Sequence, residues 1–348
     1  MPIAVFMGFQ KRFSLGSTKP PVAFHFGNDD VVRLMQINGQ GEPELEASFE
    51  VSASDDVGLK EATSCFRSRR AVVSVPSSEI LLRHIRMDCN ARDDEVVQKL
   101  CEQNDAWSHA SIRQLPILTS IRRGSHLQMQ QELLCIGISH GVIDRCVSIV
   151  ERAGMDVRRV TVPVHATLRA FDKLYRREGD ETITSMVVEM DKKQTIAMIA
   201  HGMNLVVASI LQHKTQQSPK QECSSVPALI PTVSSGNEFE RRGDVLPRGF
   251  AEPTHVSTIC GDNTFVEELR GCIGHHSSLF PERAIDRIVF SGCGALQKEM
   301  CSSVATDLGL QGYIADPSAW ISGAEELASG PIWTTVAGLC FAYSGEAI

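Results

Sequence analysis

Short apolar runs separated by turn residues dominate the first part of the chain. The polar cluster 27–30 lies between two such runs, which predicts two strands joined by a tight turn. A proline closes the last of these runs, which has the continuous apolar character of a buried strand. Strands are predicted at 22–26, 31–37, 44–52 and 71–76, and a short helix at 59–66.

The following segment alternates helical and strand-like patterns. Between 93 and 107, apolar residues recur near the 3.6 period of a helix, and acidic residues occupy the first turn. Gly154 follows a second helical stretch and is the usual residue at a helix end. Strands are predicted at 80–87, 132–139 and 157–162, and helices at 93–107, 140–153 and 163–177.

A strand-turn-strand unit like the first one begins again near residue 184. This second occurrence predicts an internal repeat of supersecondary structure with little sequence identity. Residues 212–255 are rich in Ser, Pro, Gln, Gly and charge without any period, which predicts a disordered insertion. Strands are predicted at 184–189, 195–200, 204–211 and 285–291, and helices at 264–279, 295–308 and 330–342.

Composition narrows the class of protein. The formal net charge of −8 argues against a nonspecific nucleic-acid binder, which needs Lys and Arg against phosphate. The 11 cysteines are scattered and form no CxxC pair, so we expect reduced thiols rather than disulfides or a zinc site. No apolar run reaches the roughly 18 residues of a membrane span. Residues 1–19 are expected to be a flexible terminal segment rather than an amphipathic membrane anchor.

Several segments, in this order, resemble one protein family. The most specific is 72–83, Val-Val-Ser-Val-Pro-Ser-Ser-Glu-Ile-Leu-Leu-Arg, and weaker pieces are 142–160, 166–170, 288–295 and 334–342. Together they resemble the PilM family of type IV pilus assembly proteins, bacterial relatives of actin and FtsA. The resemblance implies an α/β actin-like (ribonuclease H-like) two-lobed fold, with duplicated βββα cores and an inserted subdomain.

The resemblance also implies a division of the chain. The first lobe is expected at 20–183, with the inserted subdomain at about 76–162. The second lobe is expected at 184–329 and carries the disordered insertion. The segment 330–348 is expected to be a C-terminal helix that returns to the first lobe.

Actin-like proteins hold nucleotide on two Asp-x-Gly turns and a third glycine turn. In the first turn here, Gly27 and Asn28 remain, but His25 replaces the Asp and Val32 replaces the phosphate-binding Lys. Asp29 and Asp30 are expected where phosphate oxygens would lie, and like charges about 4 Å apart cost about 4 kcal/mol at an effective dielectric near 20. No cation of the turn is expected to offset them, because Arg33 is one position out of register and should point to the other face.

The second turn keeps an acid, Glu189, and a hydroxyl residue, Thr195, but Asp191 replaces its glycine. The third keeps Gly292 and Gly294. The candidate nucleotide residues are Gly27, Asn28, Glu189, Thr195, Gly292 and Gly294. Two of the three elements are eroded, so we expect ATP and magnesium to bind weakly or not at all, as in a pseudo-ATPase.

Other functions have weaker support in the sequence. No nucleophile or Walker motif marks an enzyme, and neither a catalytic residue nor a metal site is predicted. The adjacent His275 and His276 should point apart and are interpreted as loop histidines, and His25 as a structural histidine. The alternatives kept open are an ATP-binding FtsA-like filament protein and a sugar-kinase-like enzyme. FtsA-like proteins usually carry a C-terminal amphipathic helix, for which we expect no room before Ile348.

The resemblance implies a partner as well. A PilM-like protein is expected in the cytoplasm at the inner face of the inner membrane, peripheral to it. There it would bind the cytoplasmic N-terminal tail of a single-span, PilN-like membrane protein, between the first lobe and the inserted subdomain. Arg83, at the end of the 72–83 stretch, is the candidate contact, and its alternative role is an ion pair that holds the subdomain onto the lobe. A homo-oligomer is left open.

Overall fold

A computed structural model describes residues 19–38, 43–123, 127–175, 183–212, 263–325 and 327–341. Apart from Lys19 and Gln212, the segments 1–19 and 212–255 lie outside the described residues, so the predictions made for them stay predictions. Among the described helices, none combines the length and apolar character needed to cross a membrane.

The first lobe is built on a five-stranded sheet with the order β3-β2-β1-β4-β8. The first three strands are antiparallel neighbours, whereas β1, β4 and β8 run parallel. Every residue of β1 is buried, as expected for a central strand covered on both faces. The strands are β1 Val22–Phe26, β2 Val31–Asn38, β3 Glu44–Ser52, β4 Arg70–Ser74 and β8 Asp156–Thr161, with helices α1 Asp56–Ser64 and α3 His140–Arg152.

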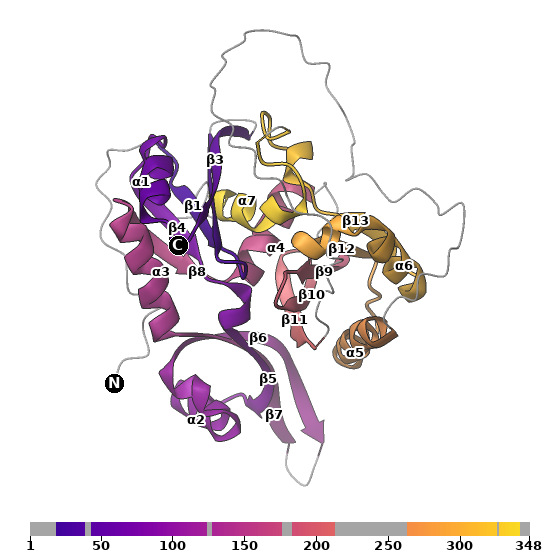
Figure 1. The fold of residues 1–348 in the computed structure, drawn as a ribbon. Coiled ribbons are helices and arrows are strands. Elements are labelled where there is room, and N and C mark those ends of the chain that lie inside the picture. The colour runs from indigo at the N-terminus through magenta and orange to yellow at the C-terminus, as the bar shows by residue number, and fades with distance from the viewer. Residues whose placement is uncertain are drawn as a thin grey trace.

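The second lobe repeats this topology (Figure 1). Its sheet has the order β11-β10-β9-β12-β13, again with three antiparallel strands followed by parallel ones. The repeat inferred from the second strand-turn-strand unit is therefore confirmed. The elements are β9 Thr184–Met190, β10 Thr195–His201, β11 Asn204–Leu211, β12 Arg287–Ser291 and β13 Gln311–Ile314, with helices α5 Asn263–Leu279 and α6 Lys298–Leu308.

A separate three-stranded sheet, β5-β7-β6, forms the inserted subdomain. One face is covered by a helix, α2, which buries Val96 and Leu100 in a small core with Trp107. The boundary near 162 was wrong: this sheet ends at Ser139, and β8 pairs with β4 in the first lobe. The elements are β5 Ile80–Asp88, α2 Asp93–Gln103, β6 Ala110–Arg123 and β7 Leu127–Ser139.

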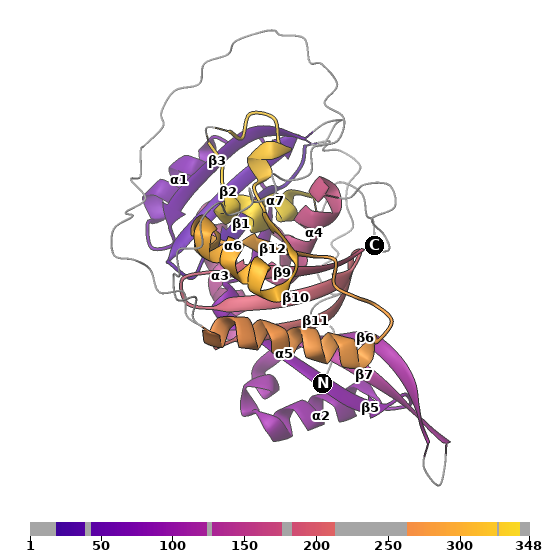
Figure 2. The same ribbon diagram turned by 90° about the vertical axis from the view of Figure 1, so that its right-hand side faces the viewer.

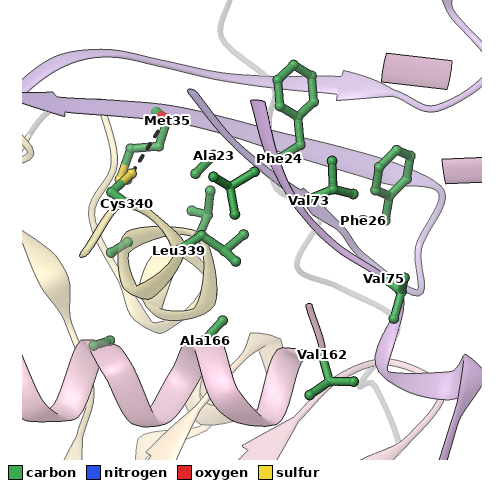
Figure 3. Packing of buried hydrophobic residues seen from close by; sticks show 14 of the residues in the cluster. Ala23, Phe24, Phe26, Met35, Val73, Val75, Val162, Ala166, Leu339 and Cys340 are labelled. Carbon is green, nitrogen blue, oxygen red and sulfur yellow. Dashed lines mark hydrogen bonds between the residues drawn. The ribbon is translucent and has the colours of Figure 1, made fainter. Parts of the chain in front are cut away.

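Two helices pack closely at the centre of the molecule, α4 Pro163–Tyr175 and α7 Thr334–Phe341. A Cβ added to Gly338 of α7 would lie 1.8 Å from the carbonyl oxygen of Ala166 on α4. Figure 3 shows α7 between this helix and the first sheet, where the Cys340 thiol donates to the carbonyl of Met35 at 3.5 Å. The described part of the C-terminal segment, α7, therefore packs into the first lobe.

Candidate functional site

Three turns, one after each of β1, β9 and β12, converge where the two lobes meet. They are residues 27–30, 191–194 and 292–296, which we call the turn junction. The register of both hairpins fixes the first two turns: β1 pairs with β2, and β9 with β10, so each turn lies at the same end of its sheet. Five of the six predicted nucleotide residues lie within or directly beside this junction, and Glu189 lies just before the second turn.

The carboxylate of Asp191 is the common contact of all three turns. It accepts a hydrogen bond from the backbone N–H of Asn28 in the first turn at 3.3 Å. It accepts another from the backbone N–H of Lys192 in its own turn at 2.7 Å. The Cys293 thiol in the third turn lies 3.7 Å from it, and burial, together with Asp191 and Asp29, raises the pKa of that thiol to about 12. A protein carboxylate thus receives backbone N–H groups of the kind that bind phosphate in related folds.

Further bonds surround Asp191, both within the first lobe and between the two lobes. The side-chain amide of Asn28 donates to Ser77 Oγ at 2.8 Å and accepts from the backbone N–H of Ser78 at 3.0 Å. Gln194 of the second lobe donates to the carbonyl of Ser77 at 2.8 Å. Asn28 is buried, so its polar atoms need these partners in place of water. The turns of the two lobes are consequently bonded directly to each other.

The charge of Asp29 is offset, contrary to the expectation from sequence. Arg33 lies 3.4 Å and Lys192 3.5 Å from its carboxylate, and Arg33 also pairs with Glu50 at 2.7 Å. The strand register places Arg33 opposite His25, from where its long side chain reaches back to the turn. Burial alone would raise the pKa of Asp29, but Arg33, Lys192 and backbone N–H groups hold it below its ordinary value.

Asp30 does not take part in this cluster. It is exposed, adopts a left-handed backbone conformation with φ of 62°, and accepts a hydrogen bond from Ser52 at 3.3 Å. The expectation that both Asp29 and Asp30 lie at the phosphate position was therefore wrong for Asp30. Asp29 alone, already paired with cations, lies on the side of the second lobe.

Buried polar groups lie behind the turns. Glu189 is 3% exposed, and Thr167 donates to its carboxylate at 3.2 Å while bonding to Thr335 at 2.9 Å. Burial, with the charge of Asp191, raises the pKa of Glu189 to about 8, so this carboxyl is mostly protonated at neutral pH. Burial and the Arg33 cation lower the pKa of His25 to about 3, which keeps that imidazole neutral.

Thr195 is fully buried, and its hydroxyl has no hydrogen-bond partner among the described residues. The glycines of the third turn serve the backbone. Gly292 has φ of 80°, and an added Cβ would lie 2.5 Å from the carbonyl oxygen of Met190. Gly294 is buried in the short 3-10 turn Cys293–Leu296. The local packing at Gly292 requires a glycine with or without a nucleotide, so its retention is no sign of ATP binding.

Arg83 does not lie where either predicted role needs it. It is exposed on the face of β5 that carries α2, and its guanidinium donates to the side chain of Gln103 at 2.8 Å. The opposite face of the inserted sheet packs against the lobes through Ile80 and Leu134. Strand alternation therefore points Arg83 away from the first lobe, and Arg83 forms no ion pair with the part of that lobe that the structure describes.

Sequence reasoning missed the central role of Asp191 and the pairing of Arg33 and Lys192 with Asp29. The sequence does show opposite charges in the two turns, but it does not show that the turns lie close enough for these charges to pair. Thr167 and Thr335 lie in two of the weaker resembling segments, but no residue pattern there marks them as partners of Glu189, which they reach from the two central helices.

Comparisons with known proteins identify the fold. No protein-family model and no curated protein matches the chain. A chain of the PilM-PilN type IV pilus biogenesis complex superposes with a TM-score of 0.64 at 12% identity, over 94% of this chain and 99% of that one. A Bacteroides thetaiotaomicron protein with an actin-like ATPase fold and unknown function superposes with a TM-score of 0.44 at 10% identity, over 86% and 91%.

The cytoplasmic domain of EpsL, from the type II secretion system of Vibrio cholerae, gives a TM-score of 0.38 at 15% identity, over 55% and 70%. The structure has two five-stranded sheets of the same topology and an inserted third sheet, and it superposes along almost the whole chain. These observations indicate the same fold. The chain has the actin-like two-lobed fold, in the form seen in the PilM-PilN complex.

Proposed function

We propose that this chain is a PilM-like scaffold that binds the cytoplasmic tail of an inner-membrane, PilN-like protein and does not use ATP. Its place would be the cytoplasm, at the inner face of the membrane, in a type IV pilus or a related secretion machine. The match in fold to a chain of the PilM-PilN complex supports the comparison with that assembly.

The observation that carries the proposal is the Asp191 carboxylate at the turn junction. Bound phosphates would need the backbone N–H of Asn28, which already donates to Asp191, and a cation such as Lys192, which is paired with Asp29. An ATP molecule would have to break these bonds and bring more negative charge next to two carboxylates. A fold whose nucleotide position is taken by its own side chains is better suited to binding a partner than to hydrolysis.

A cationic surface offers a place for that partner. Three arginines lie close together: Arg113 on β6, Arg159 on β8 and Arg169 on α4. Burial and the charges of Arg159 and Arg169 lower the pKa of Arg113. Arg113 and Arg159 are exposed and form no ion pair with any described residue. Among the described strands, β6 and β8 are edges of their sheets, so an extended tail with acidic side chains could pair with either backbone.

Binding of a synthetic PilN-like tail peptide tests the proposal. We expect binding in the absence of ATP and no change on adding it, because the cationic surface involves none of the turn-junction residues. Arg159→Glu should weaken binding at least about tenfold by opposing the acidic tail. The control Arg92→Glu, on an exposed arginine beside α2, should bind as the unchanged protein does. Binding that required ATP, or equal binding by both variants, would contradict the proposal.

A further inference from the structure

Two histidines and a glutamate come together where the inserted sheet meets the second lobe. His84 lies on β5, Glu132 on β7 and His275 on α5. The antiparallel register pairs Arg86 with Glu132 and His84 with Leu134, so His84 and Glu132 are diagonal neighbours on one face. The rings of His84 and His275 meet edge to face with centroids 4.9 Å apart. Figure 2 shows α5 and β11 beside the inserted sheet.

The three side chains have the composition and spacing of a metal site. One ring nitrogen of each histidine and one carboxylate oxygen lie within 4.8 Å of one another. Two imidazoles and a carboxylate are a donor set that Zn²⁺ and related divalent ions accept. Glu132 is buried, and Arg86 contacts its Oε2 at 3.0 Å, while the second carboxylate oxygen has no hydrogen bond or ion pair among the described residues. That ion pair would also orient the carboxylate, as outer contacts of metal ligands commonly do.

Both histidines present buried nitrogens without partners. His84 Nδ1 and His275 Nε2 have no hydrogen bond among the described residues. Buried polar atoms are nearly always bonded, so two such atoms in one cluster call for an explanation.

We propose that His84, Glu132 and His275 bind a divalent transition-metal ion, Zn²⁺ being the best match, and so fasten the inserted sheet to the second lobe. Three protein ligands leave a fourth position for water or for a donor from a partner. The adjacent His275 and His276 were expected to be loop histidines. They lie instead on α5, where His275 meets His84 and His276 lies 2.8 Å from His201, Nε2 to Nε2.

Metal binding has a predictable effect on one neighbouring bond. His84 Nε2 accepts a hydrogen bond from the backbone N–H of Ala208 on β11 at 3.3 Å, which leaves Nδ1 as the open nitrogen. A metal on Nδ1 moves the ring proton to Nε2, which can then no longer accept. The Ala208 amide hydrogen is therefore expected to exchange faster with solvent when the metal is bound. If the three residues bind no metal, adding Zn²⁺ should leave this exchange rate unchanged.

The site is tested by titrating the full, tag-free chain with Zn²⁺ in a calorimeter and by measuring thermal unfolding with and without Zn²⁺. We expect one ion bound with micromolar or tighter affinity and a higher melting temperature, both reversed by a chelator. Co²⁺ in place of Zn²⁺ should show ligand-field bands without the near-ultraviolet charge transfer of cysteine sulfur, since the ligands are nitrogen and oxygen. A strong sulfur band would assign the binding to cysteines and overturn the proposal.

Single substitutions locate the ion. His84→Ala and His275→Ala should each reduce Zn²⁺ affinity by at least about tenfold. His109→Ala removes an exposed histidine of the same subdomain and should change nothing. Circular dichroism without metal verifies folding, and Glu132→Gln provides a variant of nearly unchanged shape that should also bind more weakly. The site would be refuted if folded His275→Ala protein bound Zn²⁺ with unchanged affinity. It would also be refuted if the unchanged protein bound no Zn²⁺ at 100 µM, which is about a hundred times the expected dissociation constant.

Discussion

At the scale of the residue, the molecule depends on a few buried groups in unusual states. Glu189 is a protonated carboxyl held by Thr167, and Gly338 allows two helix backbones to touch. Neither environment could be read from the neighbours in sequence, because the groups that create it come from distant elements. A substitution at either residue therefore tests the packing around it.

Glu189→Gln should make stability less dependent on pH. The pKa of Glu189 is about 8 in the folded state against an ordinary 4.5. The contribution of Glu189 to the free energy of unfolding is fully present below pH 4.5. It is lost as the pH rises from 4.5 through 8, because in this range the residue ionises in the unfolded chain but not in the folded protein. Glutamine does not titrate, so the variant should gain on the unchanged protein by up to about 1.4 kcal/mol per pH unit in this range.

Urea unfolding at several pH values between 4.5 and 8 measures this difference. Glu61→Gln, which removes an exposed carboxyl of α1, is the control and should track the unchanged protein. Parallel stability curves for Glu189→Gln and the unchanged protein would mean that Glu189 is ionised in the fold.

Gly338→Ala should destabilise the protein by at least about 2 kcal/mol. The added methyl group would overlap the Ala166 carbonyl, 1.8 Å away, so α4 and α7 would have to separate. Gly271→Ala on α5 is a matched control: nothing lies within 4 Å of the added atom, and alanine favours a helix by up to about 1 kcal/mol. Denaturant midpoints should move in opposite directions, and equal shifts would contradict the close packing of the two helices.

At the scale of the element, the inserted subdomain has its own small core. Leu100 of α2 is fully buried there with Trp107, Leu133 and Cys135, separate from the cores of the lobes. A Cβ on Gly137 would lie 2.7 Å from the Trp107 ring, so β7 leaves space for this side chain. Such a core can loosen without the rest of the molecule.

Leu100→Ala should therefore open the inserted sheet in preference to the lobes. Truncating a buried leucine costs about 2–5 kcal/mol in the unit that contains it. Hydrogen exchange should accelerate in β5, β6, β7 and α2 and stay unchanged in β9 and β12. Uniform acceleration across all three sheets would show that the subdomain does not unfold independently.

At the scale of the whole molecule, the turn junction couples the lobes. Asn28 to Asp191, Lys192 to Asp29 and Gln194 to Ser77 all bridge the first and second lobes. In this arrangement the protein's own groups make direct contacts between the lobes. The lobes are thus held together without a ligand.

Asp191→Gly should improve binding of MgATP. Removing the carboxylate frees the backbone N–H groups of Asn28 and Lys192 for phosphate and removes a negative charge. The unchanged protein should show no rise in melting temperature at millimolar MgATP, whereas the variant should show one. Asp30→Gly is the control, because Asp30 is exposed and its carboxylate bonds to Ser52 rather than to the other two turns. A clear rise in the unchanged protein would mean that the site still accepts nucleotide.

The sequence by itself determined the strand-turn-strand repeats, most helices and the resemblance that implied the fold. These follow from periodicity and turn chemistry, which are local. It missed β6, where apolar residues do not alternate cleanly and Pro116 interrupts the pairing with a bulge, and the four-residue strand β13. The tertiary structure alone decided that Arg33 and Lys192 neutralise Asp29, that Asp191 joins three turns, and that His84, Glu132 and His275 meet. Each arrangement includes at least one contact between residues more than 40 positions apart, and only the packing of lobes and subdomain fixes such distances.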